Sequence, residues 1–127
     1  MPELPEVETV RRGLVSLIKG YKIVAAHDLH PRALKPESIA PLKSIQGAKI
    51  LDLNRRGKFL WFVLDRPQVL VAHLGMSGQF LIHQQGNPKA KHVRAQFDLT
   101  KQMRKRELVF NDQRTFGWVS VEETTDG

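Results

Sequence analysis

Hydrophobic residues near the start of the chain recur at the spacing of an α-helix. They fall three or four positions apart, at Val7, Val10, Leu14, Leu17 and Ile18. Gly20 follows where helices commonly end in a left-handed residue. The pattern predicts a helix over residues 5–19 that buries one face.

After this helix the chain changes to short hydrophobic runs that are typical of strands. A first strand is predicted over residues 21–29, and residues 38–45 predict a short second helix. Further strands, separated by turn residues, are predicted over 48–54, 58–64, 68–73, 79–83, 93–99, 107–110 and 116–121.

Residues 59–64, Phe-Leu-Trp-Phe-Val-Leu, are hydrophobic at every position and predict a strand in the interior of a sheet. Many short strands with few helices are typical of an antiparallel sandwich or a flattened barrel. We therefore expect a mainly β (α+β) fold: a two-sheet antiparallel β-sandwich with an N-terminal helix and a second short flanking helix. The length of 127 residues suits one domain, residues 1–127.

Charge narrows the class of partner. The chain has 20 Lys and Arg against 13 Asp and Glu, a formal net charge of +7. Such a surplus favours a polyanion, most often nucleic acid, although a merely basic protein would share it. The sequence has no cysteine, which excludes disulfides and thiolate metal sites. No hydrophobic run approaches the roughly 18 residues of a membrane span, and a cytosolic protein is expected.

The amino end carries a candidate nucleophile. Removal of Met1 would leave Pro2 with a terminal secondary amine. Its reference pKa of roughly 8 leaves an appreciable neutral fraction near pH 7. Such amines form Schiff bases, and Glu3 could move the protons involved. Alternatively, both residues only begin a helix, where proline and acidic side chains are favourable.

A turn rich in cations separates two predicted strands at residues 54–58, Asn-Arg-Arg-Gly-Lys. The cations could bind phosphates, with easy backbone approach at Gly57. The alternative is an ordinary solvated turn. A second basic segment, residues 89–94, contains His92, whereas residues 101–106 are expected to form a solvated hairpin tip.

Two further segments could act on a base stack. Met76 lies between two glycines in residues 73–78, where an adaptable thioether could fill the space left by an extracted base. Arg114 and Phe116 share one face of an extended segment and could hold an orphaned base and wedge the stack. The alternatives are a core methionine at a turn, a surface pair between Arg114 and Asp112, and a core phenylalanine.

The first fourteen residues, MPELPEVETVRRGL, closely resemble the amino terminus of the formamidopyrimidine-DNA glycosylases, which are bacterial base-excision repair enzymes. The resemblance implies that Pro2 is the nucleophile and Glu3 a proton carrier. It also implies that Lys58 donates a proton to the sugar oxygen. Leu4 favours this group over endonuclease VIII, which usually has glycine there.

The resemblance extends to the other motifs. It implies a void-filling role for Met76 and a DNA contact for His92. It implies that Arg114 and Phe116 are the intercalating pair, although Gln113 and Thr115 depart from the family's Asp-Pro-Arg-Arg-Phe-Gly pattern. His73 is expected to be structural.

The implied activity is that of a bifunctional glycosylase and AP lyase. It would remove oxidised purines, 8-oxoguanine and formamidopyrimidines, from damaged double-stranded DNA through a Schiff base at Pro2 and β/δ-elimination. Alternatives are a non-catalytic nucleic-acid-binding β-domain and an endonuclease VIII-like glycosylase acting on oxidised pyrimidines.

The resemblance covers only the amino-terminal half of the family. Its complete members continue into a helix–two-turn–helix domain and usually a four-cysteine zinc finger. We therefore expect a fragment or isolated domain, weakly active or inactive alone. No cofactor is expected in this chain, and zinc only in the absent carboxyl-terminal part. We also expect a monomer in the bacterial cytoplasm, with no membrane partner.

Overall fold

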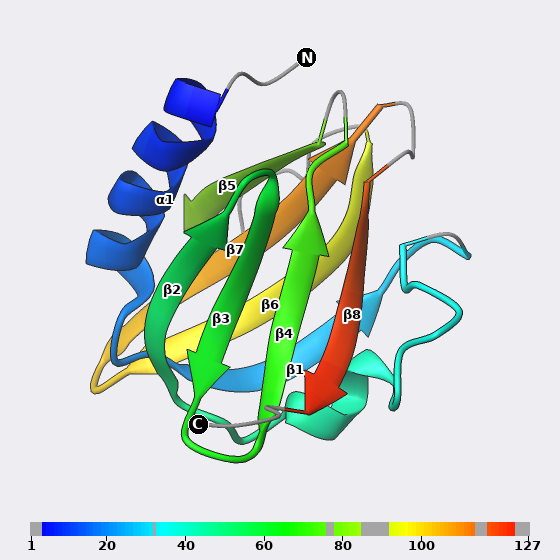
Figure 1. The fold of residues 1–127 in the computed structure, drawn as a ribbon. Coiled ribbons are helices and arrows are strands. Elements are labelled where there is room, and N and C mark those ends of the chain that lie inside the picture. Colours follow the sequence, from blue (N-terminus) through cyan, green and yellow to red (C-terminus); the bar gives the residue numbers. More distant parts are fainter. Residues whose placement is uncertain (1–3, 32, 76–77, 85–91, 114–116, 124–127) are drawn as a thin grey trace.

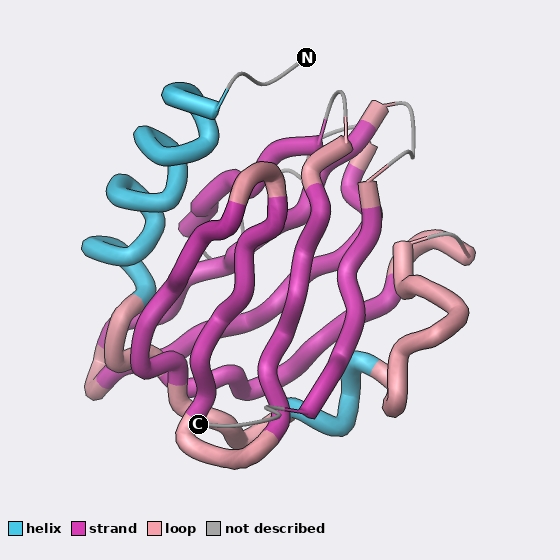
Figure 2. Tube along the Cα trace, viewed as in Figure 1, coloured by secondary structure: helices cyan, strands magenta, loops and turns pink. Residues whose placement is uncertain are grey.

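The computed structural model describes residues 4–31, 33–75, 78–84, 92–113 and 117–123. Two four-stranded antiparallel sheets pack face to face as a sandwich, with one α-helix and one 3-10 helix in these residues (Figure 1, Figure 2). The expected mainly β sandwich is confirmed. No helix in the described part of the chain is long and hydrophobic enough to cross a membrane.

The elements follow the predicted order. They are α1 (Leu4–Ile18), β1 (Lys22–Asp28), η1 (Leu42–Ile45), β2 (Ile50–Arg56), β3 (Phe59–Leu64), β4 (Gln68–His73), β5 (Gly78–Gln84), β6 (Val93–Lys101), β7 (Arg104–Asp112) and β8 (Trp118–Glu123). One sheet has the strand order β1-β6-β7-β5 and the other β2-β3-β4-β8. Strand β3 therefore lies inside its sheet, as its continuous hydrophobic run predicts.

The second predicted helix is shorter than expected. Only Leu42–Ile45 is helical, and it is a 3-10 turn instead of the predicted segment 38–45. Pro41 explains the late start, because a proline disfavours helical backbone in the residue before it. The Ser38 hydroxyl also donates a hydrogen bond to the Ala40 carbonyl at 2.7 Å, which holds this segment in a bend.

Helix α1 packs along the edge formed by β2 and β5 (Figure 1). It contributes Val7, Leu14 and Ile18 to a core that fills the space between the sheets. Gly20 has φ +88° and ends the helix, and its N–H donates to the Ile50 carbonyl at 2.8 Å. The predicted helix and its glycine stop are thus confirmed, whereas Val10 and Leu17 of the predicted hydrophobic face are exposed.

Strand register brings distant segments to one end of the sandwich. Phe59 of β3 pairs with His73 of β4, which pairs in turn with Trp118 of β8. In the other sheet Gly78 pairs with Asp112. We call this the upper end, as drawn in Figure 1, where α1 also begins. The lower end carries η1 and the β6–β7 turn.

Candidate functional site

Of the residues that the sequence predicts for a site, Lys58 and His92 lie in the described part of the chain. The others lie outside the described residues: Pro2, Glu3, Met76, Arg114 and Phe116. The residues that flank them are described, and they gather at the upper end (Figure 1). The site can therefore be built from Lys58, His92 and the supports of the remaining segments.

A row of rings crosses three strands beside Lys58. The Phe59 ring centroid lies 4.7 Å from that of His73, and His73 stacks on Trp118 at 5.7 Å with an interplanar angle of 17°. The Lys35 ammonium lies 4.4 Å from the Trp118 ring centroid, within range of a cation–π interaction. An aromatic row flanked by Lys35 and Lys58 suits an anionic partner with planar groups.

His73 is held in one defined state. The Gly75 N–H donates a hydrogen bond to its Nδ1 at 3.2 Å, so in the neutral ring Nε2 carries the proton. Burial, and secondly the charge of Lys58, lowers the pKa of His73 below its ordinary value. A neutral imidazole with a fixed Nε2–H can donate to an anionic oxygen such as a phosphate. The structural role that the sequence predicts for His73 stays a prediction, and its hydrogen bond with Gly75 fits that role.

At the upper end, two hydrogen bonds join the described residues that flank the predicted segments 76–77 and 114–116. The Gly78 N–H donates to the Leu74 carbonyl at 2.8 Å, and the Gly117 N–H donates to Asp112 Oδ2 at 2.7 Å. Gly117 is required by close approach, because a Cβ there would lie 2.6 Å from the His73 carbonyl oxygen. Each bond joins the described residues on either side of one predicted segment, and the close approach of Gly117 to the His73 carbonyl oxygen brings the two pairs of flanking residues together.

Asp112 is an internal anchor. Its side chain has no exposed surface, whereas the alternative interpretation placed it in a surface pair. Its N–H donates to the His92 carbonyl at 3.0 Å, and Arg94 Nε donates to its carbonyl at 2.9 Å. His92 therefore lies against the support of the segment that contains Arg114 and Phe116.

An ionic cluster joins α1 to the β2–β3 hairpin. Glu8 Oε1 accepts from Arg11 Nε at 3.0 Å and from Arg55 Nε at 2.9 Å. Glu8 Oε2 accepts from Arg11 Nη2 at 2.6 Å and from Arg12 Nε at 2.9 Å. The hydrogen bonds from Arg11 and then Arg55 hold the pKa of Glu8 well below its usual range. Glu8 is thus an anion throughout the neutral pH range.

The Arg55 side chain also bonds within its own turn. Its Nη1 donates to the Gly57 carbonyl at 3.1 Å, directly before Lys58. The sequence predicts either phosphate contacts or a solvated turn for residues 54–58, and the structure places the Arg55 guanidinium on Glu8 and Gly57. Lys58 is half-buried after this turn, near enough to influence His73.

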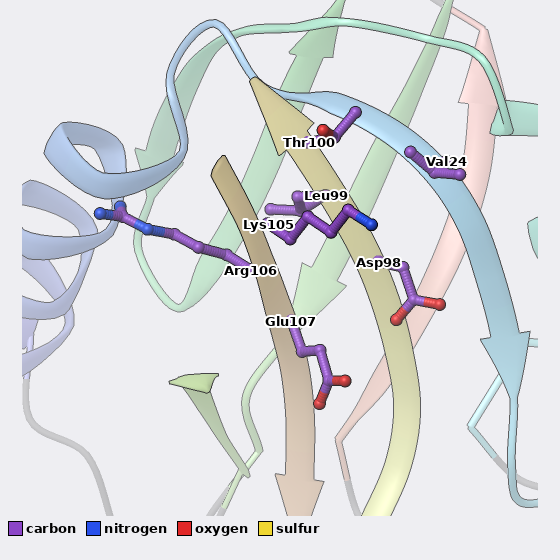
Figure 3. A pocket seen from close by; sticks show the side chains of 7 residues that line it. All are labelled: Val24, Asp98, Leu99, Thr100, Lys105, Arg106 and Glu107. Atoms are coloured by element: carbon purple, nitrogen blue, oxygen red, sulfur yellow. The ribbon is translucent and has the colours of Figure 1, made fainter. Parts of the chain in front are cut away.

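A separate pocket of about 230 Å³ opens on the outer side of β6 and β7 (Figure 3). It is lined by Val24, Asp98, Leu99, Thr100, Lys105, Arg106 and Glu107. None of these is a predicted site residue, and the pocket lies toward the β6–β7 turn at the lower end. The described residues contain no group of three His, Cys, Asp or Glu side chains that could hold a metal ion.

Known proteins match the chain over almost its whole length. The family model described as the formamidopyrimidine-DNA glycosylase N-terminal domain matches residues 1–119. The formamidopyrimidine-DNA glycosylase of Acidothermus cellulolyticus is 48% identical over 124 residues, covering 95% of this chain and 43% of that protein. That of Corynebacterium glutamicum is 44% identical over 141 residues, covering all of this chain and 47% of that protein.

Solved structures agree with these matches. The Lactococcus lactis Fpg (MutM) protein in complex with a Fapy-dG-containing DNA has a TM-score of 0.83 at 32% identity, over 96% of this chain and 44% of that chain. A structure of MutM with a DNA containing carbocyclic 8-oxo-G has a TM-score of 0.84 over 97% of this chain and 45% of that one. The chain thus spans less than half the length of these relatives.

Proposed function

Because this chain belongs to the formamidopyrimidine-DNA glycosylase family, we propose that it is the amino-terminal catalytic domain of a DNA glycosylase and AP lyase. Its substrates are oxidised purines in damaged double-stranded DNA. The supporting observation is the upper end of the sandwich, where the start of α1, the Lys58 turn and the closed supports of two predicted DNA-contacting segments gather.

The reaction starts at Pro2 after Met1 has been removed. The lone pair of the Pro2 nitrogen forms a bond to C1′ of the damaged nucleotide, and the bond from C1′ to the base breaks. The base leaves with that electron pair and takes up a proton. Glu3 carries protons between the amine, the base and the sugar.

Lys58 acts on the sugar. It donates a proton to the ring oxygen as the ring opens, while the nitrogen loses its own proton and becomes an iminium on C1′. This cation acidifies the C2′ proton, because it accepts the electrons that are released on deprotonation. Elimination of the 3′ and then the 5′ phosphate follows, and hydrolysis of the Schiff base frees Pro2.

The remaining predicted residues hold the DNA. Met76 fills the space of the extruded nucleotide, and Arg114 and Phe116 contact and separate the bases that remain. His92 contacts the backbone beside them. The neutral His73 imidazole, with its Nε2–H, offers one more donor for a phosphate oxygen next to Lys58.

We propose that further DNA-binding parts lie in a longer protein that contains this chain. The matched relatives are more than twice as long as the stretch they share with this chain. The zinc site expected for the family belongs to that part, since this sequence has no cysteine. Residues 1–127 alone are then expected to bind damaged DNA weakly and to cleave it poorly.

Borohydride trapping on DNA that contains an abasic site tests the proposal, using the intact gene product that carries this chain. A covalent adduct is expected, and it should be lost in Pro2→Gly and whenever Met1 is retained. Lys58→Met should slow strand cleavage, whereas Lys105→Met, in the separate pocket of Figure 3, should not.

The alternatives give different outcomes. DNA binding without an adduct would support a non-catalytic nucleic-acid-binding domain. An adduct together with faster excision of oxidised pyrimidines than of 8-oxoguanine would support an endonuclease VIII-like enzyme. A mass measurement of the amino terminus establishes whether Pro2 is free.

A further inference from the structure

We propose that Glu8 and Arg55 form a positioning pair, which fixes helix α1 against the β2–β3 turn so that the start of the chain and Lys58 meet the same sugar. This inference rests on the proposed function. Neither Glu8 nor Arg55 takes part in making or breaking bonds in the DNA. Both act through the elements that carry the reacting groups.

The Arg55 guanidinium makes two hydrogen bonds, one to α1 and one to its own turn. Its Nε donates to Glu8 Oε1 at 2.9 Å, and its Nη1 donates to the Gly57 carbonyl at 3.1 Å. One planar, rigid fork therefore joins the second turn of α1 to the residue that precedes Lys58. A shift of the helix would have to break this fork or move the turn with it.

A second connection fixes how the helix is rotated. Arg11 binds the same Glu8 carboxylate and also donates from Nη1 to the Leu53 carbonyl at 3.1 Å. Leu53 is fully buried in β2, two positions before Arg55. The carboxylate is thus tied to the body of the sheet through Arg11 and to the turn through Arg55. Together these contacts set both the distance and the rotation of α1.

Arg12 offers a matched comparison within the same cluster. It also donates to Glu8, at 2.9 Å, but its side chain is 74% exposed against 25% for Arg55. Within the described residues Arg12 makes no hydrogen bond to the hairpin, so its link to Glu8 stays on the helix surface. An exposed pair of this kind contributes little. If the bond to the hairpin matters, substitution of Arg55 will slow adduct formation and substitution of Arg12 will not.

The experiment measures single-turnover borohydride trapping at saturating abasic-site DNA, in the intact gene product with a free Pro2. Arg55→Met is expected to slow adduct formation on the order of 100-fold, with unchanged DNA affinity, since small misplacements of reacting groups have effects of that size. Glu8→Gln combined with Arg55→Met should be no slower than the slower single variant. Arg12→Met should match the wild type.

Two further variants and one measurement separate positioning from folding. Arg55→Lys retains the charge beside Glu8 but not the bond to Gly57, and its rate should be intermediate. Amide hydrogen exchange at residues 56–59 in the DNA-free protein should accelerate in Arg55→Met and not in Arg12→Met, at equal thermal stability.

The outcomes are distinguishable. The positioning pair is overturned if the wild type forms the adduct and Arg55→Met forms it as fast as Arg12→Met. Equal hydrogen exchange at residues 56–59 in the two variants overturns it as well. Both outcomes leave the proposed function in place. A wild-type protein with free Pro2 that forms no adduct overturns the proposed function and this inference with it.

Discussion

The two ends of the sandwich differ in the groups that close them. At the upper end, directed polar bonds fix the backbone: Asp112 holds Gly117, and Gly75 holds His73. At the lower end, Leu42 and Ile45 of η1 close the core as hydrophobic side chains with at most 2% exposure. Hydrophobic burial is strong but non-directional, whereas hydrogen bonds fix orientation. Directed bonds also occur near η1, as from Ala26 N–H to Gln46 Oε1, but at the upper end they hold the backbone beside the predicted site residues.

This contrast separates stability from chemistry. Substitutions at the lower end should weaken folding and leave the reaction unchanged in the folded molecules. Substitutions at the upper end should affect DNA binding or cleavage beyond their effect on folding. The following variants are ordered from the largest expected change in the free energy of unfolding to the smallest.

Ile45→Ala should destabilise the protein by about 2–5 kcal/mol, because it leaves a cavity where the side chain is fully buried. Urea unfolding measures the loss. The rate of borohydride trapping at saturating DNA, well below the melting temperature, should equal that of the wild type. A slower rate in the folded variant would show that the two ends are coupled.

Gly117→Ala should cost about 1–3 kcal/mol through overpacking, since the new Cβ would lie 2.6 Å from the His73 carbonyl oxygen and 2.9 Å from the Phe110 ring. It should also weaken binding to lesion DNA, because the backbone that supports Arg114 and Phe116 must move. Equilibrium DNA binding and thermal unfolding test both effects.

Gly13→Ala is the control for that substitution. A Cβ at this helical position would meet nothing within 4 Å. It should stabilise the protein by roughly 0.5–1 kcal/mol through helix propensity, with no change in DNA binding. Equal DNA binding by the two alanine variants would contradict the role given to Gly117.

His73 should make stability pH-dependent at the upper end. Its folded-state pKa is lowered, first by burial and then by Lys58, so the unfolded chain binds the proton more readily. The stability contribution is complete above about pH 6.5, the ordinary value for histidine, and is lost as the pH falls through the folded pKa. The free energy of unfolding, measured with urea between pH 5 and 7, should depend less steeply on pH in His73→Gln than in the wild type. An unchanged pH dependence of the unfolding free energy would refute the lowered pKa of His73.

Met103→Ser should change the free energy of unfolding by no more than about 0.5 kcal/mol, because the side chain is 95% exposed at the β6–β7 turn. Thermal unfolding measures this effect. A larger loss would mean that the turn packs against another part of the protein, and the description of the lower end would need revision.

Local patterns were sufficient for most of the fold. Strand β4 has the predicted bounds, Gln68–His73, because its hydrophobic run is closed by turn residues on one side and a glycine segment on the other. Strand β7 extends over Arg104–Asp112 beyond the predicted 107–110. The first three residues of β7 are charged and show no hydrophobic alternation, so the pattern does not predict them as strand. The Arg106 guanidinium lies 5.2 Å from the centroid of the Tyr21 ring, a tertiary contact that no local pattern contains.

The site divides in the same way. Lys58 could be found because cations cluster at a turn between two strands. Glu8 has Arg11 and Arg12 three and four positions later, a spacing that predicts ion pairs on the helix surface. Its bond to Arg55 spans 47 residues and depends on how α1 packs, so spacing could not reveal it. The burial of Asp112 likewise follows from tertiary structure alone.

The row of rings has a consequence for how the sheet assembles. Next to Phe59, His73 and Trp118 runs a second row, Leu60, Ala72 and Val119, which is fully buried. A slip of β4 by one residue would exchange the faces of His73 and Ala72 and force the imidazole into the hydrophobic interior. His73, which donates to a phosphate oxygen in the proposed reaction, therefore also disfavours this shifted register of the sheet.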